Sequence, residues 1–276
     1  GALADSSISR ITLKGDIDIG STLTVNRTVT LDLNGCVLKM TGSDSVIKVE
    51  ADGDLTIQDR NTTTQHKFNP HCKYLTWYID MWELDNGGSE IVSGGVITGG
   101  GGDQSNGGGV LVAGGTLVMA GGSIVGCSAM SRGGGVCNNG TFIMSDGMIK
   151  GCTSPDGQYA SGGGVRNSNQ FTMTGGMIGD PDNENDASHV YNTSSQETTL
   201  TISGNAKIYT DITNVGILNA DGGEIAGTMT NDTNRYGTGT ITGSEGAAGS
   251  TKFQDKVTNN GTIRKGTFTN EVINES

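Results

Sequence analysis

An aromatic-rich stretch carries the residues best suited to contact a ligand. Both tryptophans lie in it, and its candidate ligand-binding residues are Tyr74, Trp77, Tyr78 and Trp82. Flat rings exposed on a loop stack on sugar faces or anchor a protein partner, because tryptophan and tyrosine bring a large contact area at low entropy cost. Alternatively, Trp77 and Trp82 cover the side or end of the fold and hide apolar surface that would otherwise attract partners.

A short acidic segment offers a second kind of chemistry. Asp180, Asp182, Glu184 and Asp186 place carboxylates at every second position, and oxygen donors spaced in this way suit a hard cation such as calcium. The segment lacks the glycine and the distal bidentate glutamate of an EF-hand loop. These carboxylates therefore form a candidate calcium site, with a solvated acidic turn as the alternative. No other cofactor is expected.

Thiol and imidazole groups are scattered along the chain. His66, His71 and Cys72 could supply zinc ligands, but their spacing matches no closed site and a fourth ligand is missing. The five cysteines form no disulfide framework. Cys127 and Cys152 share one place in successive repeats, and stacked strands lie about 4.8 Å apart, so a disulfide is sterically conceivable. A buried ladder of free thiols is the alternative.

The element that must position these side chains is a glycine-punctuated repeat. Gly107–Val110 returns as Gly133–Val136 and as Gly162–Val165, a spacing of 25 to 30 residues. Each copy is followed by an apolar stretch that ends in methionine, and then by a turn and an isoleucine. A period of this length, built from three short strand-like pieces and glycine turns, predicts an all-β solenoid with three short strands per coil.

Aligned copies of the repeat predict rows of like residues along the solenoid axis. One inward row is Val110, Val136, Val165 and Val190, and another is Leu117, Phe142, Phe171 and Leu200. Two positions after the valine row, three copies carry asparagine: Asn138, Asn167 and Asn192. Asparagines in one slot suggest a ladder whose side-chain amides bond between coils. A polar binding row is the alternative.

The repeat also predicts the organisation of the chain. We expect a single β-helix domain over residues 1–276, with an aromatic-rich loop at 60–90 inserted between coils and shorter coils at 226–276. Loop length varies at one corner, at residues 99–106, 128–132, 153–161 and 180–188. Insertions of this kind map to one face, which in repeat proteins is often the working face.

Composition and charge exclude several classes of function. The net charge of −12 and the pI near 4.5 argue against binding of nucleic acid through its phosphates and suit a soluble protein displayed outside a cell. No apolar run reaches the roughly 18 residues that a membrane span needs. No signal peptide is visible, and Gly1–Ala4 is compatible with removal of a native leader or anchor.

Three features carry a family resemblance: Leu31–Gly35, Gly94–Gly100 and the repeated Gly-Gly-Gly-Val sequences. They resemble right-handed parallel β-helix proteins of the pectate-lyase-like superfamily. More narrowly, they are similar to the glycine-rich β-helix segments of large secreted or wall-attached bacterial proteins. The resemblance covers roughly residues 8 to 225 and implies a right-handed parallel β-helix. The superfamily includes polysaccharide lyases, glycoside hydrolases, adhesins and structural stalks, so the fold does not choose among them.

The catalytic motifs of that superfamily are not found in this chain. A polysaccharide hydrolase needs paired carboxylates flanking the sugar bond, and the pectin-cleaving members show adjacent aspartates, a Gly-His-Gly and an Arg-Ile-Lys. Here Ile263–Lys265 reads Ile-Arg-Lys. A lyase would need a calcium-binding acidic cluster and a basic residue, and Arg132 and Arg166 lie in the right region without an acidic ladder. A polysaccharide-active enzyme is therefore the alternative rather than the expectation.

The expected function is non-catalytic adhesion or glycan binding by a segment of an extracellular or cell-surface-attached bacterial protein. Its partner would be an extracellular polysaccharide or a host or cell-surface protein. A lyase or glycosidase and a purely structural stalk are the alternatives. An enzyme should show carboxylates within about 5 to 10 Å of one another on one face. An adhesin should show exposed aromatic residues without them, and a stalk should show neither.

Overall fold

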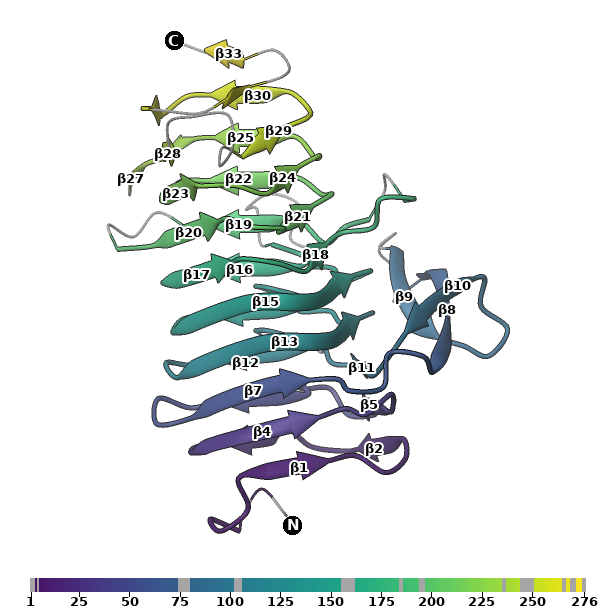
Figure 1. Ribbon diagram of the computed structural model, residues 1–276. Helices are drawn as coiled ribbons and strands as arrows, with labels where there is room; N and C mark the ends of the chain where they lie inside the picture. The colour runs from purple at the N-terminus through teal and green to yellow at the C-terminus, as the bar shows by residue number, and fades with distance from the viewer. Residues whose placement is uncertain are drawn as a thin grey trace.

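The chain winds into a parallel β-helix in which each coil contributes three strands (Figure 1). The computed structural model describes residues 3, 5–73, 80–101, 106–154, 162–183, 186–193, 197–234, 237–243, 251–264, 267–268 and 272–274. The coils stack in chain order, so that the two termini lie at opposite ends of the molecule. The predicted all-β solenoid with three strands per coil is confirmed.

Three faces run the length of the β-helix. The first face comprises β1 (Arg10–Thr12), β4 (Thr28–Asp32), β7 (Asp54–Gln58), β13 (Thr116–Val125), β15 (Thr141–Lys150), β17 (Gln170–Met173), β20 (Thr199–Ile202), β23 (Ile217–Ala220), β28 (Thr240–Gly243) and β31 (Thr262–Ile263). The second face comprises β2 (Ile17–Ile19), β5 (Val37–Met40), β11 (Val96–Thr98), the ends of β13 and β15, β18 (Met177–Ile178), β21 (Lys207–Ile208), β24 (Glu224–Ile225), β29 (Lys252–Phe253) and β32 (Thr267–Phe268). Because β13 and β15 continue through the corner, these two faces join into one 18-stranded sheet.

The third face is a separate ten-stranded sheet, with one strand from each coil. It comprises β3 (Leu23–Val25), β6 (Ile47–Val49), β12 (Val110–Val112), β14 (Val136–Asn138), β16 (Val165–Asn167), β19 (Val190–Asn192), β22 (Ile212–Asn214), β25 (Met229–Asn231), β30 (Val257–Asn259) and β33 (Val272–Asn274). A hairpin of β26 (Thr233–Asn234) and β27 (Gly237–Thr238) separates β25 from β28.

Inward rows of like side chains fill the β-helix. Strand register aligns both predicted rows, the valines that begin at Val110 and the larger side chains that begin at Leu117. Within the second row the rings of Phe142 and Phe171 stack, with centroids 4.4 Å apart. The row residues are buried in one continuous cluster. Burial of this apolar surface is the main favourable contribution to folding.

The predicted asparagine ladder is confirmed, and it extends beyond the three residues that the repeat indicated. The Nδ2 of Asn138 donates to the Oδ1 of Asn167 at 2.7 Å. The same bond recurs up the stack through Asn192, Asn214, Asn231 and Asn259, at 2.7 to 2.8 Å. All six side chains are buried, so the ladder is an internal structural element and the polar binding row is not supported.

The triple glycines mark places where backbone stacks directly on backbone. A Cβ on Gly135 would lie 2.6 Å from the carbonyl oxygen of Gly164 in the next coil. The N–H of Gly135 donates to the oxygen of Gly163 at 2.9 Å. Any larger residue would push the coils apart at this turn, which explains why the glycines recur with the repeat.

The aromatic-rich stretch contains a three-stranded antiparallel sheet, which we call the insertion. It consists of β8 (Gln65–Lys73), β9 (Asp80–Leu84) and β10 (Glu90–Ser93), and it projects from the side of the β-helix (Figure 1). The sequence suggested a loop between coils. The insertion instead lies within the third coil, because β7 and β11 before and after it both keep their parallel pairing with strands of the neighbouring coils.

Candidate functional site

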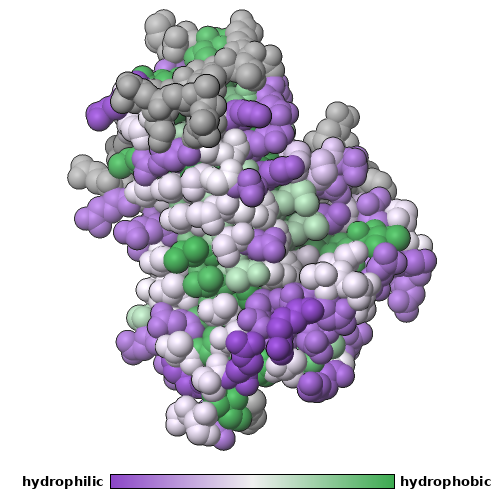
Figure 2. Space-filling model, viewed as in Figure 1, coloured by the Kyte–Doolittle hydropathy of each residue, from purple (hydrophilic) through white to green (hydrophobic). Residues whose placement is uncertain are grey.

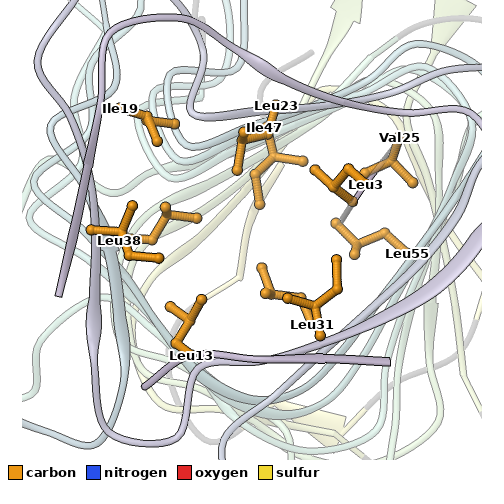
Figure 3. A pocket seen from close by; sticks show the side chains of 11 residues that line it. Leu3, Leu13, Ile19, Leu23, Val25, Leu31, Leu38, Ile47 and Leu55 are labelled. Atoms are coloured by element: carbon orange, nitrogen blue, oxygen red, sulfur yellow. The ribbon is translucent and has the colours of Figure 1, made fainter. Parts of the chain in front are cut away.

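The open N-terminal end of the β-helix forms an apolar cavity of about 240 Å³ (Figure 3). Side chains of the first coils, including Leu13, Leu31, Leu38 and Ile47, surround it. Its described lining contains no polar side chain. Specific ligand sites combine apolar walls with a few well-placed polar groups, so this cavity lacks the means to orient a ligand.

The outer surface of the first face is flat and carries few charges. Its outward positions from β13 to β28 are Thr116, Val118, Thr141, Ile143, Gln170, Thr172, Thr199, Thr201, Ile217, Asn219, Thr240 and Thr242. Figure 2 shows residues of intermediate hydropathy over the middle of the molecule, as this threonine-rich composition predicts. Threonine is favoured on exposed strands for its β-branched shape, so this surface needs no functional explanation.

A groove of about 490 Å³ lies where the insertion meets the corner between the second and third faces. The β-helix contributes residues 39–43 and 98–101 together with Gly126 and Ser128, and β9 contributes residues 82–84. This volume lies in the usual range of small-molecule sites, about 300–1,000 Å³. The groove lies at the corner where loop length varies between repeats.

Polar groups from separate coils meet in the groove. Lys39 on β5 brings an ammonium group, and Glu83 on β9 brings a carboxylate that is exposed to solvent. Thr41, Ser43, Thr98 and Ser128 add hydroxyl groups. Such a mixture of donors and acceptors suits a ligand rich in hydroxyl groups. Glu83 is the only carboxylate among the described lining residues, so they do not supply the acid pair that glycoside hydrolysis uses.

Trp82 fastens the insertion to the β-helix. Its side chain is only 2% exposed and lies in a second apolar cluster with Phe68 and the outward-facing Val96 and Val125. Gly151 has a φ of +59°, and a side chain there would collide with the indole ring. The groove wall formed by β9 is therefore held by close packing.

A buried ion pair lies against the same tryptophan. The Nζ of Lys150 lies 4.3 Å from the centroid of the Trp82 ring, a cation–π distance. It also lies 3.2 Å from the Oδ2 of Asp180. Both charged side chains are less than one tenth exposed. Lys150 therefore connects the insertion, the second face and the acidic segment.

Asp186 is a buried carboxylate held by backbone donors. Its Oδ1 accepts hydrogen bonds from the N–H groups of Gly151 at 3.1 Å and Ser188 at 2.9 Å. Burial raises the pKa of Asp186; the hydrogen bonds from Ser188 and Gly151 oppose this shift, and the nearby charge of Asp180 adds to it. The charged form is therefore less favourable in the folded chain than in the unfolded one.

Asp186→Asn is expected to raise the Tm at pH 7. The pKa of Asp186 is raised in the folded state, so its ionisation destabilises the fold at neutral pH, and the penalty disappears as the pH falls below the ordinary value of 3.8. Asparagine keeps the Oδ1 acceptor without the charge. Thermal unfolding from pH 3.5 to 8 should show the largest gain at high pH. A uniform loss of stability at every pH would contradict this reading.

The acidic residues predicted to bind calcium have different surroundings in the structure. Asp180 and Asp186 are both 6% exposed and are engaged as described above, and Asp182 is exposed. Glu184 lies outside the described residues. Within the described ranges no group of three or more His, Cys, Asp or Glu side chains could hold a metal ion. The two buried acids have structural partners, and calcium binding stays an untested expectation.

The predicted aromatic ligand-binding residues are only partly described. Tyr74, Trp77 and Tyr78 lie outside the described residues. Trp82 has a buried ring, as the covering alternative requires, although it also contributes to the groove wall. Sequence reasoning missed Lys39 and Glu83, because neither belongs to a motif and only coil stacking brings their segments together.

The described cysteines Cys36, Cys127, Cys137 and Cys152 are free thiols. Cys127 and Cys152 occupy the core in successive coils, as the free-thiol alternative proposed. Burial, together with neighbouring Cys127, raises the pKa of Cys152 well above its ordinary value. The protonated thiol of Cys152 therefore acts as a small apolar side chain.

Comparison with known proteins assigns this chain to no family. No family model matches it, and no curated protein or solved structure matches it significantly. The fold defines the class, an all-β protein built as a parallel β-helix. In the part of the chain that the structure describes, no helix is long and apolar enough to span a membrane.

Proposed function

We propose that this protein is a non-catalytic glycan-binding segment of a secreted or surface-attached bacterial protein. The observation that carries the proposal is the groove beneath the insertion, in which an ammonium, a carboxylate and several hydroxyl groups surround a space of about 490 Å³. Sugars present many hydroxyl groups, and each can exchange hydrogen bonds with such a lining. The resemblance to pectate-lyase-like β-helices supports the choice of a polysaccharide ligand.

The double variant Lys39→Gln/Glu83→Gln is expected to weaken glycan retention by about 10-fold or more, because hydrogen bonds to charged groups contribute about 1.5–3 kcal/mol each. Both side chains are at least partly exposed, so the fold should be unaffected. Retention on plant, host and microbial polysaccharides would be measured by affinity electrophoresis, with released reducing ends assayed in the same samples. The matched control is Lys67→Gln/Glu90→Gln, which changes the same charges on the insertion outside the groove.

Each outcome of this experiment points to a different class of function. Retention that needs Lys39 and Glu83, without release of reducing ends, supports the proposal. Release of reducing ends would replace it with the polysaccharide-active enzyme. Retention that the double variant does not reduce would exclude the groove as the site. No retention on any polymer would favour the structural stalk.

A further inference from the structure

A second group of polar residues, none of which lines the groove, lies on the outer surface of the third face. Strand register places Arg166 of β16 between Cys137 of β14 and Tyr191 of β19. The Cζ of Arg166 lies 5.3 Å from the centroid of the Tyr191 ring, so the ring face orients the guanidinium group. The Nε of Arg166 is buried and makes no hydrogen bond with any residue that the structure describes. This arginine is therefore positioned but incompletely satisfied.

Arg132 brings a second positive charge to the same surface. It precedes Gly133, whose φ is +63° and where a Cβ would lie 2.8 Å from the Cα of Cys137, so the loop folds back over β14. Burial, and then the like charge of Arg132, lowers the pKa of Arg166. Both arginine charges also act on the buried thiol of Cys137. The two arginine charges therefore act on each other and on the same thiol.

The charge of this arginine pair is not balanced within the described residues. The ion pairs found there involve Lys48, Arg60 and Lys150 instead. Holding two like charges together, one of them half-buried, costs free energy unless an anion compensates them. In a chain with a net charge of −12, two interacting cations without an acidic partner among the described residues point to an anionic ligand.

The row that begins at Arg166 continues as a line of hydroxyl groups. Register aligns Tyr191, Thr213, Thr230 and Thr258 along the axis, and all four side chains are partly exposed. Burial raises the pKa of Tyr191, so its hydroxyl keeps its proton and can donate. Successive strands lie about 4.8 Å apart, and such a line of donors fits an extended polymer better than a free ion.

We propose that this surface binds a sulfated polysaccharide, with a sulfate ester held by Arg166 and Arg132 and the following sugars lying along Tyr191 and the threonines. Two guanidinium groups and a phenolic hydroxyl offer donors to the three free oxygens of a sulfate ester. None of these residues lines the groove. It relies on the proposed glycan binding only for the choice of a polymeric ligand.

The test is titration of the full chain with dextran sulfate, with unsulfated dextran as the matched neutral polymer and polygalacturonate as the carboxylate source. Arg166→Gln and Arg132→Gln are each expected to weaken dextran sulfate binding about 10-fold, and the binding should weaken with added salt. Arg166→Lys should give an intermediate loss, because lysine keeps the charge but not the planar fork. The control variant Lys207→Gln, which removes an exposed charge on the second face, should leave dextran sulfate binding unchanged.

The Tm of the unliganded variants distinguishes a ligand-binding role of Arg166 from a purely structural one. Removal of an unsatisfied cation in Arg166→Gln should leave the Tm of the unliganded chain unchanged or raise it. A lower Tm with unchanged binding would overturn the proposal, as would equal binding of dextran and dextran sulfate or absence of binding. If polygalacturonate binds more tightly than dextran sulfate, and this binding depends on the two arginines, the ligand group is a carboxylate rather than a sulfate ester. If Lys39→Gln/Glu83→Gln abolishes dextran sulfate binding while the arginine variants keep it, this inference fails and the groove proposal survives.

Discussion

Asn192→Ala is expected to lower the free energy of unfolding by about 3–5 kcal/mol, because each buried polar group left without a partner costs about 1–3 kcal/mol. Asn192 stands in the middle of the ladder. Its Oδ1 accepts from Asn167 at 2.7 Å, and its Nδ2 donates to Asn214 at 2.7 Å and to the carbonyl of Ile217 at 3.1 Å. Alanine breaks all three bonds of a side chain that is fully buried.

Urea unfolding, followed by far-ultraviolet circular dichroism, measures this loss. The control is Asn205→Ala, which removes the same group from an exposed turn and should change the free energy of unfolding by less than about 0.5 kcal/mol. Each coil packs only on its neighbours, so the loss should also appear as faster amide exchange in β19 and β22. Equal stability of the two variants would show that the ladder contributes little beyond its packing.

Lys150→Met is the second large effect, with an expected destabilisation of about 3–5 kcal/mol, the usual result of removing one partner from a buried ion pair. Asp180 is 6% exposed and would lose its only described charged partner, at 3.2 Å. The cation–π contact with Trp82 would be lost as well. Because Trp82 fastens the insertion, amide exchange in β8, β9 and β10 should become faster.

The double variant Lys150→Met/Asp180→Asn separates charge from packing. It removes both charges, and replacing a buried pair by neutral groups of similar volume is often close to neutral. It should therefore recover most of the stability that Lys150→Met alone loses. A double variant as unstable as the single one would mean that the lysine acts through its contact with Trp82. Asp182→Asn, an exposed acid in the same segment, is the control and should have little effect.

The repeat predicted the interior of the β-helix well. Each inward position is occupied by the same kind of residue in successive coils, so alignment of the copies beginning at Val110, Leu117 and Asn138 is sufficient to find the rows. The period of two within strands and the glycine turns between them are local properties. These signals weaken at β2 (Ile17–Ile19), whose residues are an exposed isoleucine, an exposed aspartate and a partly exposed isoleucine.

The sequence carried only a weak indication of where the insertion attaches to the β-helix. Val96–Ile97 and Ile124–Val125 place two apolar residues side by side, which departs from strict alternation. In the structure Ile97 and Ile124 face the core, whereas Val96 and Val125 face outward beneath Phe68 and Trp82. Consecutive apolar residues in an otherwise alternating strand thus indicate that its outer surface is covered. They do not say which segment covers it.

The sequence by itself determined the class of fold, the inward rows and the asparagine ladder, because these depend on a repeat that each coil copies. Only the tertiary structure decided that Lys39 and Glu83 share a groove, that Lys150 pairs with Asp180, and that Arg166 packs against Tyr191. Each of these arrangements brings together residues from different coils or from the insertion, at positions that the repeat leaves free to vary. Their proximity follows from the number of residues in the intervening loops and from the place of the insertion within one coil, and neither quantity has a periodic signature.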